Sequence, residues 1–265
     1  MATETMAIIE AGGYRSPTDR DVRIGPRVEG AVAGTRLHLP DETLPAPPPQ
    51  GSERPAIEVT NETSLSAARR MGPDVACLVF ASAKNPGGGF LSGAQAQEES
   101  IARSSALYPC QTAAGDFYSF HRRQGDLRYS DRVIYSPRVP VFRADDGALL
   151  EEPYPVSFLT AAAPNLGAIA ANQPTATGTV PGALAARAAR VLAVAAAHGH
   201  RRLVLGAWGC GVFRNDPAVV AEAFAEQLAR AQGHFDHVVF AVLDGQRGAP
   251  THAAFTGVLC RPAVR

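Results

Sequence analysis

Two adjacent glutamates, Glu98 and Glu99, follow shortly after three consecutive glycines, Gly87, Gly88 and Gly89. Glycine lets the backbone approach a ligand closely and turn its N–H groups into one concavity, which suits phosphate. A carboxyl group beside a bound diphosphate has its pKa raised by like charge and partial burial. Such a group can act as the general acid that protonates a leaving alkoxide, as in glycoside hydrolysis. The pattern therefore predicts a phosphate loop next to a proton-transfer group.

The two glutamates do not fit the usual carboxylate pair of a glycosidase. Adjacent residues of a helix point about 100° apart, so Glu98 and Glu99 do not easily flank one scissile bond. We expect one carboxylate to transfer the proton and its neighbour to hold a sugar hydroxyl. A structural alternative exists, because Glu99 and Arg103 have the i,i+4 spacing of an ion pair on a solvated helix face.

A second glycine-rich segment, "GAWGCGVFRND", covers 206–216. It lacks the Lys-Ser/Thr of a nucleoside triphosphate loop. Asp216 has the type and position of a helix N-cap, and its charge would repel an anion from the helix tip. Any phosphate here would therefore be held by the loop amides ahead of the helix. Phe213 lies among these small residues, either as a plug of the core or as a stacking surface for a ribose or base.

The elements that must position these residues alternate between strand and helix. Apolar patterning predicts strands over 56–62, 74–82, 132–143, 154–165, 201–208 and 237–244. It predicts helices over 63–71, 93–108 and 181–198, and another that begins at Pro217. The helix start at Gly93 comes from the capping-box spacing of Ser92 and Gln95, and it puts both glutamates in the second turn.

This alternation indicates an α/β fold with a sheet covered on both sides. Ligands of such sheets collect beyond the carboxyl ends of the strands, where both glycine loops should lie. The run 74–82 reads as a strand buried on both faces, and the prolines within 132–143 favour an edge strand or a bend. Two divisions are expected: an N-terminal extension with a proline-rich arm, 1–55, and a catalytic domain, 56–265. The arm contains five prolines between Leu44 and Pro55 and should run extended.

Composition narrows the function classes. The 265 residues have a formal net charge of +0, which gives no electrostatic footprint for duplex DNA or an anionic membrane. No stretch approaches the roughly 20 apolar residues of a membrane span, and the first residues lack the pattern of a signal peptide. The four cysteines are scattered without a C-x-x-C pair, so we expect neither a zinc site nor disulfides. We expect a cytoplasmic, monomeric protein.

Together these segments resemble a known family. Three glycines, seven intervening residues and Gln97-Glu98-Glu99 resemble the G-G-G-x(6–8)-Q-E-E signature of poly(ADP-ribose) glycohydrolases. The surrounding "FASAKNPGGGFLSGAQAQEESIARSSALYP", with "IEVTNETSLSAAR" upstream and "LGAWGCGVFRNDP" downstream, looks like the bacterial-type branch. The resemblance spans roughly Ile57 to Asp244.

The resemblance implies a macrodomain-like three-layer fold, with a mixed, mostly parallel sheet between helices. It implies hydrolysis of the ribose–ribose O-glycosidic bond of poly(ADP-ribose), mainly from the chain end, with release of ADP-ribose and with no metal or cofactor. The implied partners are the polymer, ADP-ribose and ADP-ribosylated proteins, and the implied setting is the DNA damage response.

Residue roles follow from the same match. Glu99 matches the catalytic acid/base, and Glu98 matches the neighbour that contacts the ribose. Gln97 matches a substrate-positioning residue, and Asn85 a ribose contact. The match assigns diphosphate binding to two loops, Gly87, Gly88 and Gly89 in the first and Gly209, Cys210, Gly211, Val212 and Phe213 in the second. The adenine-stacking residue stays open among Tyr108, Tyr118 and Phe255.

Two other functions remain possible on this fold. A macrodomain that only binds ADP-ribose would have no use for two glutamates beside a diphosphate loop. A hydrolase of mono-ADP-ribosylated side chains would not be expected to carry the Gln-Glu-Glu motif.

Overall fold

A computed structural model describes residues 1–45, 48 and 54–260. Within these residues a 7-stranded sheet has the order β3-β6-β7-β5-β8-β9-β4, and β1 and β2 form a separate antiparallel pair. The strands are β1 (Gly13–Arg15), β2 (Asp21–Arg23), β3 (Arg36–His38), β4 (Ala56–Thr60), β5 (Val75–Phe80), β6 (Val133–Arg143), β7 (Leu149–Ala161), β8 (Arg202–Gly206) and β9 (His237–Ala241). The pairs among β7, β5, β8, β9 and β4 are parallel, while β6 pairs antiparallel with both β3 and β7.

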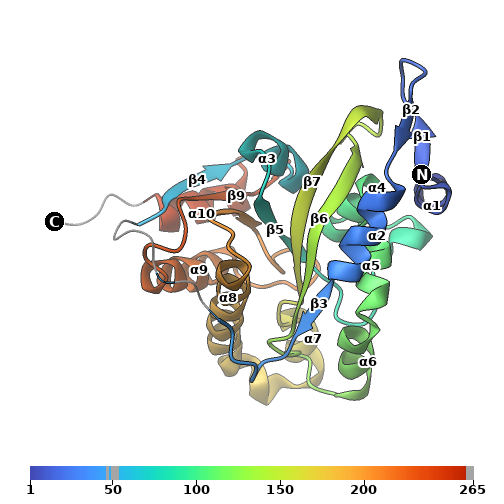
Figure 1. The fold of residues 1–265 in the computed structure, drawn as a ribbon. Helices are drawn as coiled ribbons and strands as arrows, with labels where there is room; N and C mark the ends of the chain where they lie inside the picture. The colour runs from blue at the N-terminus through green and yellow to red at the C-terminus, as the bar shows by residue number, and fades with distance from the viewer. Residues whose placement is uncertain (46–47, 49–53, 261–265) are drawn as a thin grey trace.

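Helices cover both faces of the sheet (Figure 1). They are α1 (Ala2–Ala11), α2 (Gly25–Gly34), α3 (Ser64–Met71), α4 (Gln97–Ser104), α5 (Leu107–Ala113), α6 (Gly115–Arg123), α7 (Leu166–Asn172), α8 (Val180–Ala197), α9 (Pro217–Arg230) and α10 (Pro250–Leu259), with 3-10 turns η1 (Phe90–Ser92) and η2 (Pro174–Thr179). One core cluster joins the sheet to α8, α9 and α10, and another joins it to α1 to α5. This confirms the expected three-layer fold.

The apolar stripes expected from the sequence are the buried faces of the helices. In α8, Leu184, Ala188 and Val191 are buried, and in α9 Val220 and Phe224 are buried. Asp216 caps α9 by accepting a hydrogen bond from the Ala218 amide at 2.8 Å. Central strand β5 lies between β7 and β8 and is buried on both faces, as its apolar run predicted. Because β5, β8, β9 and β4 are parallel, their carboxyl ends share one edge of the sheet.

The helix predicted over 93–108 is wrong at its start. Ser92 ends the 3-10 turn η1, and its hydroxyl donates to the Gly89 carbonyl instead of capping a helix. Gly93 has a φ of 86°, a left-handed conformation that interrupts any helix there. Helix α4 therefore begins at Gln97, and both glutamates lie in its first turn.

The prolines of β6 were predicted to indicate an edge strand or a bend, and the structure has the bend. Strand β3 pairs with β6 only along Val133–Tyr135, so this part of β6 is interior to the sheet. Beyond it, the register shifts between Ser136 and Val139, around Pro137. The sheet partner β7 begins at Leu149, earlier than the predicted residue 154, because it continues the hairpin with β6.

The N-terminal extension is built into this fold. Its strand β3 forms one edge of the main sheet, and Ile8, Ile24 and Val28 are buried in the same core cluster as β5. Within the described residues, the sheet and this core cluster include elements from both sides of residue 55. The proline-rich arm predicted over 44–55 lies largely outside the described residues.

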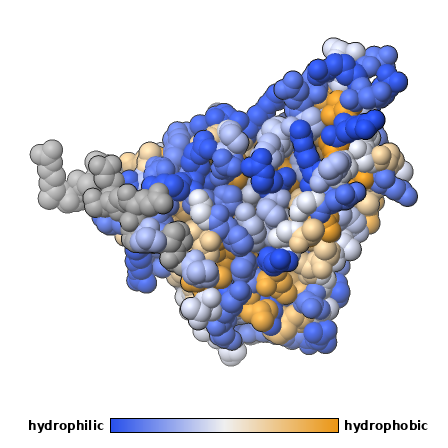
Figure 2. All heavy atoms as spheres, in the orientation of Figure 1, coloured by the Kyte–Doolittle hydropathy of each residue, from blue (hydrophilic) through white to orange (hydrophobic). Residues whose placement is uncertain are grey.

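One segment departs from the expectation of no membrane-length apolar stretch. Residues 174–197 are long and apolar enough by composition to cross a membrane, and 50% of the most apolar window is buried inside the fold. Helix α8 packs on α9 and on the sheet, which accounts for its apolar side chains. Figure 2 shows one face of the molecule, where polar residues cover most of the surface and apolar residues form patches between them.

Candidate active site

A cavity of about 1040 Å³ opens at the carboxyl ends of the parallel strands. Its walls come from the ends of β5, β8 and β9, from α3 and α4, and from the segment that follows β8. Gln97, Glu98 and Glu99 line it together with Gly209 to Phe213. Two of the predicted motifs thus face one cavity, although Glu98 and Phe213 are 115 residues apart in the chain (213 − 98).

Glu98 is held by two N–H donors in an almost fully buried position. Its carboxylate accepts from the Ser82 amide at 2.6 Å and from Gln111 Nε2 at 2.9 Å. Burial raises the pKa of Glu98 to about 8, while these two hydrogen bonds act to lower it. A carboxyl group in this balance can change its charge near neutral pH, which suits a functional group.

Glu99 is fastened at both oxygens. Oε1 accepts from the Gly89 amide at 2.8 Å, and Oε2 accepts from the Ala96 amide at 3.2 Å. The second bond caps α4, so the side chain helps to begin the helix that carries it. The structural alternative of a Glu99–Arg103 pair is wrong, because Arg103 donates to the Ala94 carbonyl and to Ser100 Oγ instead.

The amides of the first glycine loop are hydrogen-bonded within the protein. The Gly87 amide donates to Gln111 Oε1, the Gly88 amide to the Asn85 carbonyl, and the Gly89 amide to Glu99 Oε1. All three N–H groups therefore have acceptors within the protein. The loop needs glycine for another reason: Gly88 has a φ of 58°, and a Cβ there would overlap the Glu99 carboxylate.

The side chain of Gln97 lines the cavity and is hydrogen-bonded to neighbouring elements. Its Oε1 accepts from the Phe80 amide at 2.9 Å, and its Nε2 donates to the Leu78 carbonyl at 2.7 Å and to Ser64 Oγ at 3.1 Å. The amide group is thus occupied by the backbone of β5 and by α3. Gln97 fastens the first turn of α4 to the central strand.

The second loop is free to bind an anion. Among the hydrogen bonds of the described chain, none is donated by the backbone amides of Gly209, Gly211, Val212 and Phe213. Asn215 holds the loop from behind, donating to the Pro164 carbonyl at 2.8 Å and to the Gly209 carbonyl at 3.1 Å. Successive unpaired N–H groups form a concavity that suits phosphate oxygens.

Phe213 contacts both the core and the cavity. It packs against the core cluster beside α8 and α9, and it also lines the cavity. Its ring lies 6.1 Å from that of Tyr129, whose backbone has a φ of 63°. A tyrosine in this conformation is strained and must be held by its surroundings.

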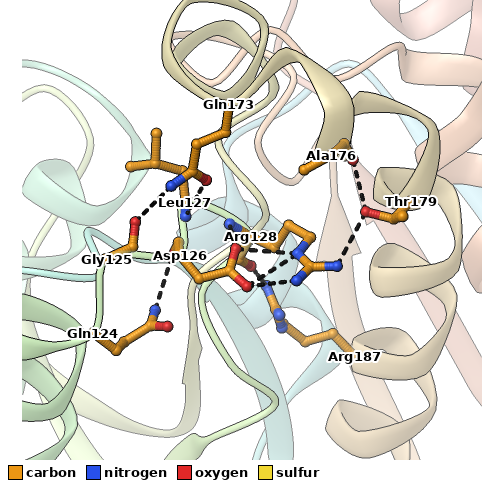
Figure 3. A network of polar contacts seen from close by, with 9 residues as sticks. All are labelled: Gln124, Gly125, Asp126, Leu127, Arg128, Gln173, Ala176, Thr179 and Arg187. Atoms are coloured by element: carbon orange, nitrogen blue, oxygen red, sulfur yellow. Dashed lines mark hydrogen bonds and ion pairs between the residues drawn. The ribbon is translucent and has the colours of Figure 1, made fainter.

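Figure 3 shows the polar network that holds the segment before Tyr129. Gln173 accepts from the Leu127 amide at 3.0 Å and donates to the Gly125 carbonyl at 2.8 Å. Arg187, buried in α8, donates to the Arg128 carbonyl at 2.8 Å. These contacts fix the loop between α6 and β6, and so fix Tyr129 behind Phe213.

Several predicted residues are not brought to the cavity. Asn85 is exposed, and it does not line the cavity. Of the three adenine-stacking candidates, Tyr118 and Phe255 are buried in the core, and Tyr108 packs on Phe90 beside Gly87. None of the three lines the cavity. Cys210 does, and burial raises its thiol pKa to about 12.

The sequence reasoning missed Ser82, Gln111 and Asn215, which hold the site together. Gln111 carried one available signal, since it follows Leu107 at i+4 spacing and therefore continues an apolar helix face. A polar residue on such a face must find a buried partner. The contribution of Ser82 comes from its backbone amide, which no residue type reveals.

Comparison with known proteins adds the family. Residues 2–144 match the family described as microbial-type PARG, catalytic domain, where PARG stands for poly(ADP-ribose) glycohydrolase. No curated protein matches the chain.

Solved structures are similar over nearly the whole chain. Poly(ADP-ribose) glycohydrolase from Thermomonospora curvata has 54% sequence identity and a TM-score of 0.89, over 97% of this chain and 97% of that chain. The same enzyme bound to the inhibitor ADP-HPD has a TM-score of 0.88 at 54% identity, with 97% of each chain covered. The enzyme from Deinococcus radiodurans in complex with ADP-ribose has 49% identity and a TM-score of 0.84, over 90% of this chain and 98% of that chain.

Proposed function

The chain belongs to the poly(ADP-ribose) glycohydrolases of the microbial type, and we propose that Glu99 and Glu98 divide the hydrolytic work between them. As a member of this family it is a glycosidase, and its substrate is poly(ADP-ribose). The cavity volume of about 1040 Å³ suits a ligand the size of ADP-ribose.

The second glycine loop is the proposed seat of the diphosphate. Four of its amides lack an acceptor within the described chain, those of Gly209, Gly211, Val212 and Phe213. A diphosphate would supply acceptors for them. Phe213 lines the cavity at the end of this loop, so the ribose next to the diphosphate would lie against its ring. That ribose would then reach the first turn of α4.

Proton transfer is assigned to Glu99. Its protonated carboxyl gives the proton to the 2′ oxygen of the leaving ribose as the C1″–O bond breaks. The carboxylate so formed then takes a proton from a water, whose oxygen bonds to the oxocarbenium carbon. Glu98, held by Ser82 and Gln111, accepts a hydrogen bond from a ribose hydroxyl and faces the developing positive charge.

Attack from the chain end is the second part of the proposal. Asp244, after β9, accepts from the amides of Gln246 and Thr251 at 3.0 and 2.7 Å. These hydrogen bonds lower the pKa of Asp244 and keep the segment 244–251 folded against the cavity. A wall at this end supports a site that accepts a terminal ADP-ribose unit more readily than a chain interior.

The observation that carries the function is the meeting of two acids and four free amides in one cavity. The test is to incubate the protein with purified poly(ADP-ribose) and to resolve the products. We expect free ADP-ribose from the wild type. Glu99→Gln should lose turnover by about a thousandfold, since a general acid contributes up to roughly 10⁴, and should still bind ADP-ribose in calorimetry.

Glu226→Gln is the matched control, because Glu226 is an exposed residue of α9 paired only with Arg230 in the described structure. It should keep full activity. Near-wild-type turnover in Glu99→Gln would overturn the assignment of Glu99. If the wild type binds the polymer and leaves it intact, the chain is a reader of ADP-ribose and the proposed function is wrong.

A further proposal concerns the location and partners of the protein. The described cysteines are free thiols, which supports a cytoplasmic location. We further propose that the protein acts as a monomer on ADP-ribosylated proteins, without binding duplex DNA or membranes, in the DNA damage response. Cell fractionation and sedimentation would check location and oligomeric state.

A further inference from the structure

Gln111 connects the two halves of the acid site from a fully buried position. It belongs to α5, and its side chain is 0% exposed. Its Oε1 accepts from the Gly87 amide at 2.9 Å, and its Nε2 donates to Glu98 Oε1 at 2.9 Å. One side chain therefore binds both the glycine loop and a carboxylate of α4.

The orientation of the Gln111 amide is set by its partners. A backbone N–H can only donate, so the oxygen of Gln111 must face Gly87 and its NH₂ group must face Glu98. Glu98 Oε1 is therefore held as an acceptor. Its Oε2 is held in the same way by the Ser82 amide at 2.6 Å. Both contacts favour the carboxylate over the carboxylic acid.

The other influences on Glu98 act in both directions. Burial and the charge of Glu99 raise the pKa of Glu98, whereas the Gly87 amide lowers it, as Ser82 and Gln111 do. Tyr118 of α6 interacts with Glu98 electrostatically, and its hydroxyl has no hydrogen-bond partner. No Arg or Lys of the described residues forms an ion pair with Glu98. The donors Ser82, Gln111 and Gly87 thus keep the ionised form accessible, and Gln111 is the one among them that acts through its side chain.

We propose that Gln111 is a positioning residue for the hydrolysis: it holds Glu98 as an ionised acceptor for the ribose hydroxyl and ties Gly87 to the same carboxylate. The inference rests on the proposed function, in which Glu98 grips the ribose. It adds a residue that touches neither the substrate nor the breaking bond.

The inference predicts a particular pH dependence. Because the productive form of Glu98 is ionised, kcat/KM of the wild type should rise as the pH increases toward about 8. Gln111→Met has a similar shape and removes the donor to Glu98. Without that donor the carboxylate is harder to form, so the midpoint of the rise should move up by about one pH unit, with about a tenfold lower kcat/KM at pH 7.

Gln111→Glu provides the conservative comparison. When protonated, its carboxyl can donate to Glu98 and still accept from Gly87, so activity at low pH should be partly retained. When both carboxyls ionise they repel each other, and activity should fall where the wild type's rises. Gln227→Met is the matched control: Gln227 is 8% exposed in α9, and the variant should leave midpoint and kcat/KM unchanged.

The measurements distinguish failure of the inference about Gln111 from failure of the proposed function. ADP-ribose release by the wild type, with an unshifted midpoint in Gln111→Met, would overturn the inference and leave the proposed function intact. No release by the wild type would overturn both. If thermal unfolding shows that Gln111→Met does not fold, Gln111→Glu decides: a profile that parallels the wild type's contradicts the inference, and a reversed slope supports it.

Discussion

At the scale of single residues, each amide in the first glycine loop has an acceptor supplied by the protein itself. Two of those acceptors, Gln111 and Glu99, belong to the acid site. The loop therefore helps to hold both carboxylates. Gly89 donates to Glu99 directly, and Gly87 donates to Gln111, which in turn donates to Glu98. In the loop after β8, which we propose as the diphosphate site, four amides donate to no acceptor of the described chain.

Gly88→Ala should therefore reduce catalysis more than affinity. A Cβ at this position would overlap Glu99 Oε1 and lie 3.0 Å from Glu98 Oε2, so both carboxylates would have to move. A shift of about 1 Å in a catalytic group can cost roughly a hundredfold in rate. We expect a loss of that order in kcat, with the Kd for ADP-ribose in calorimetry changed less than about threefold.

Gly93→Ala is the control for backbone strain alone. Gly93 also has a positive φ, 86°, but a Cβ there meets nothing within 4 Å. This variant should lose about 1 kcal/mol of stability and keep its kcat. An equal loss of kcat in both variants would mean that strain, and not displacement of the carboxylates, limits the rate.

At the scale of elements, α4 is positioned by its own first residues. Gln97 occupies the Phe80 amide and the Leu78 carbonyl, groups near the end of β5 where strand pairing with β8 stops at Cys77. Glu99 supplies the cap at Ala96. The start of the site helix thus depends on tertiary contacts made by the motif residues themselves.

The elements that could be predicted from the sequence are those whose starts and ends depend on neighbouring residues. Strand β5 and helix α9 follow from local signals, an apolar run and an Asp-Pro start, and the structure has both. The start of α4 could not be predicted in this way, because its cap is a side chain inside the helix and the Ser92 spacing imitates a cap. Gln111 acts on partners 13 and 24 residues away, and Asn215 ties its own loop to Pro164, 51 residues away; no local pattern encodes these contacts.

Gln97→Ala should weaken both the fold and the activity. It leaves the Phe80 amide and the Leu78 carbonyl without the partner that Gln97 provides, and unpaired buried groups cost about 1–3 kcal/mol each. We expect a loss of about 2–3 kcal/mol in the free energy of unfolding, measured by urea titration, together with a lower kcat. Unchanged stability would contradict the view that this side chain fastens α4 to β5.

At the scale of the whole molecule, the N-terminal extension is a structural part of the sheet and of one core. Strand β3 extends the sheet beyond β6, and α1 and α2 bury Ile8, Ile24 and Val28 against it. The family match also begins at residue 2, well ahead of the proline-rich segment. The described residues before the proline-rich segment therefore contribute to the same sheet and core as the residues after it.

Removal of residues 1–45 should prevent stable folding. Burial of a Val or Ile side chain is worth about 1.5–3 kcal/mol, so losing three of them costs on the order of 5 kcal/mol, comparable with the stability of a whole domain. We expect the truncated chain to lose its cooperative thermal transition in calorimetry. A truncated protein with a sharp transition and wild-type turnover would show instead that 56–265 folds alone.

Strand β4 at the opposite edge has a consequence for biosynthesis. Its sheet partner is β9, and Ala56 pairs with His237, 181 residues later (237 − 56). A ribosome adding roughly 5–20 residues per second needs about 10–40 seconds to deliver that partner. Throughout this interval the segment of β4, with Ile57 and Val59, has no β9 to pair with. A charged residue on an unpaired strand discourages pairing with other chains, and Glu58 lies between these two apolar residues.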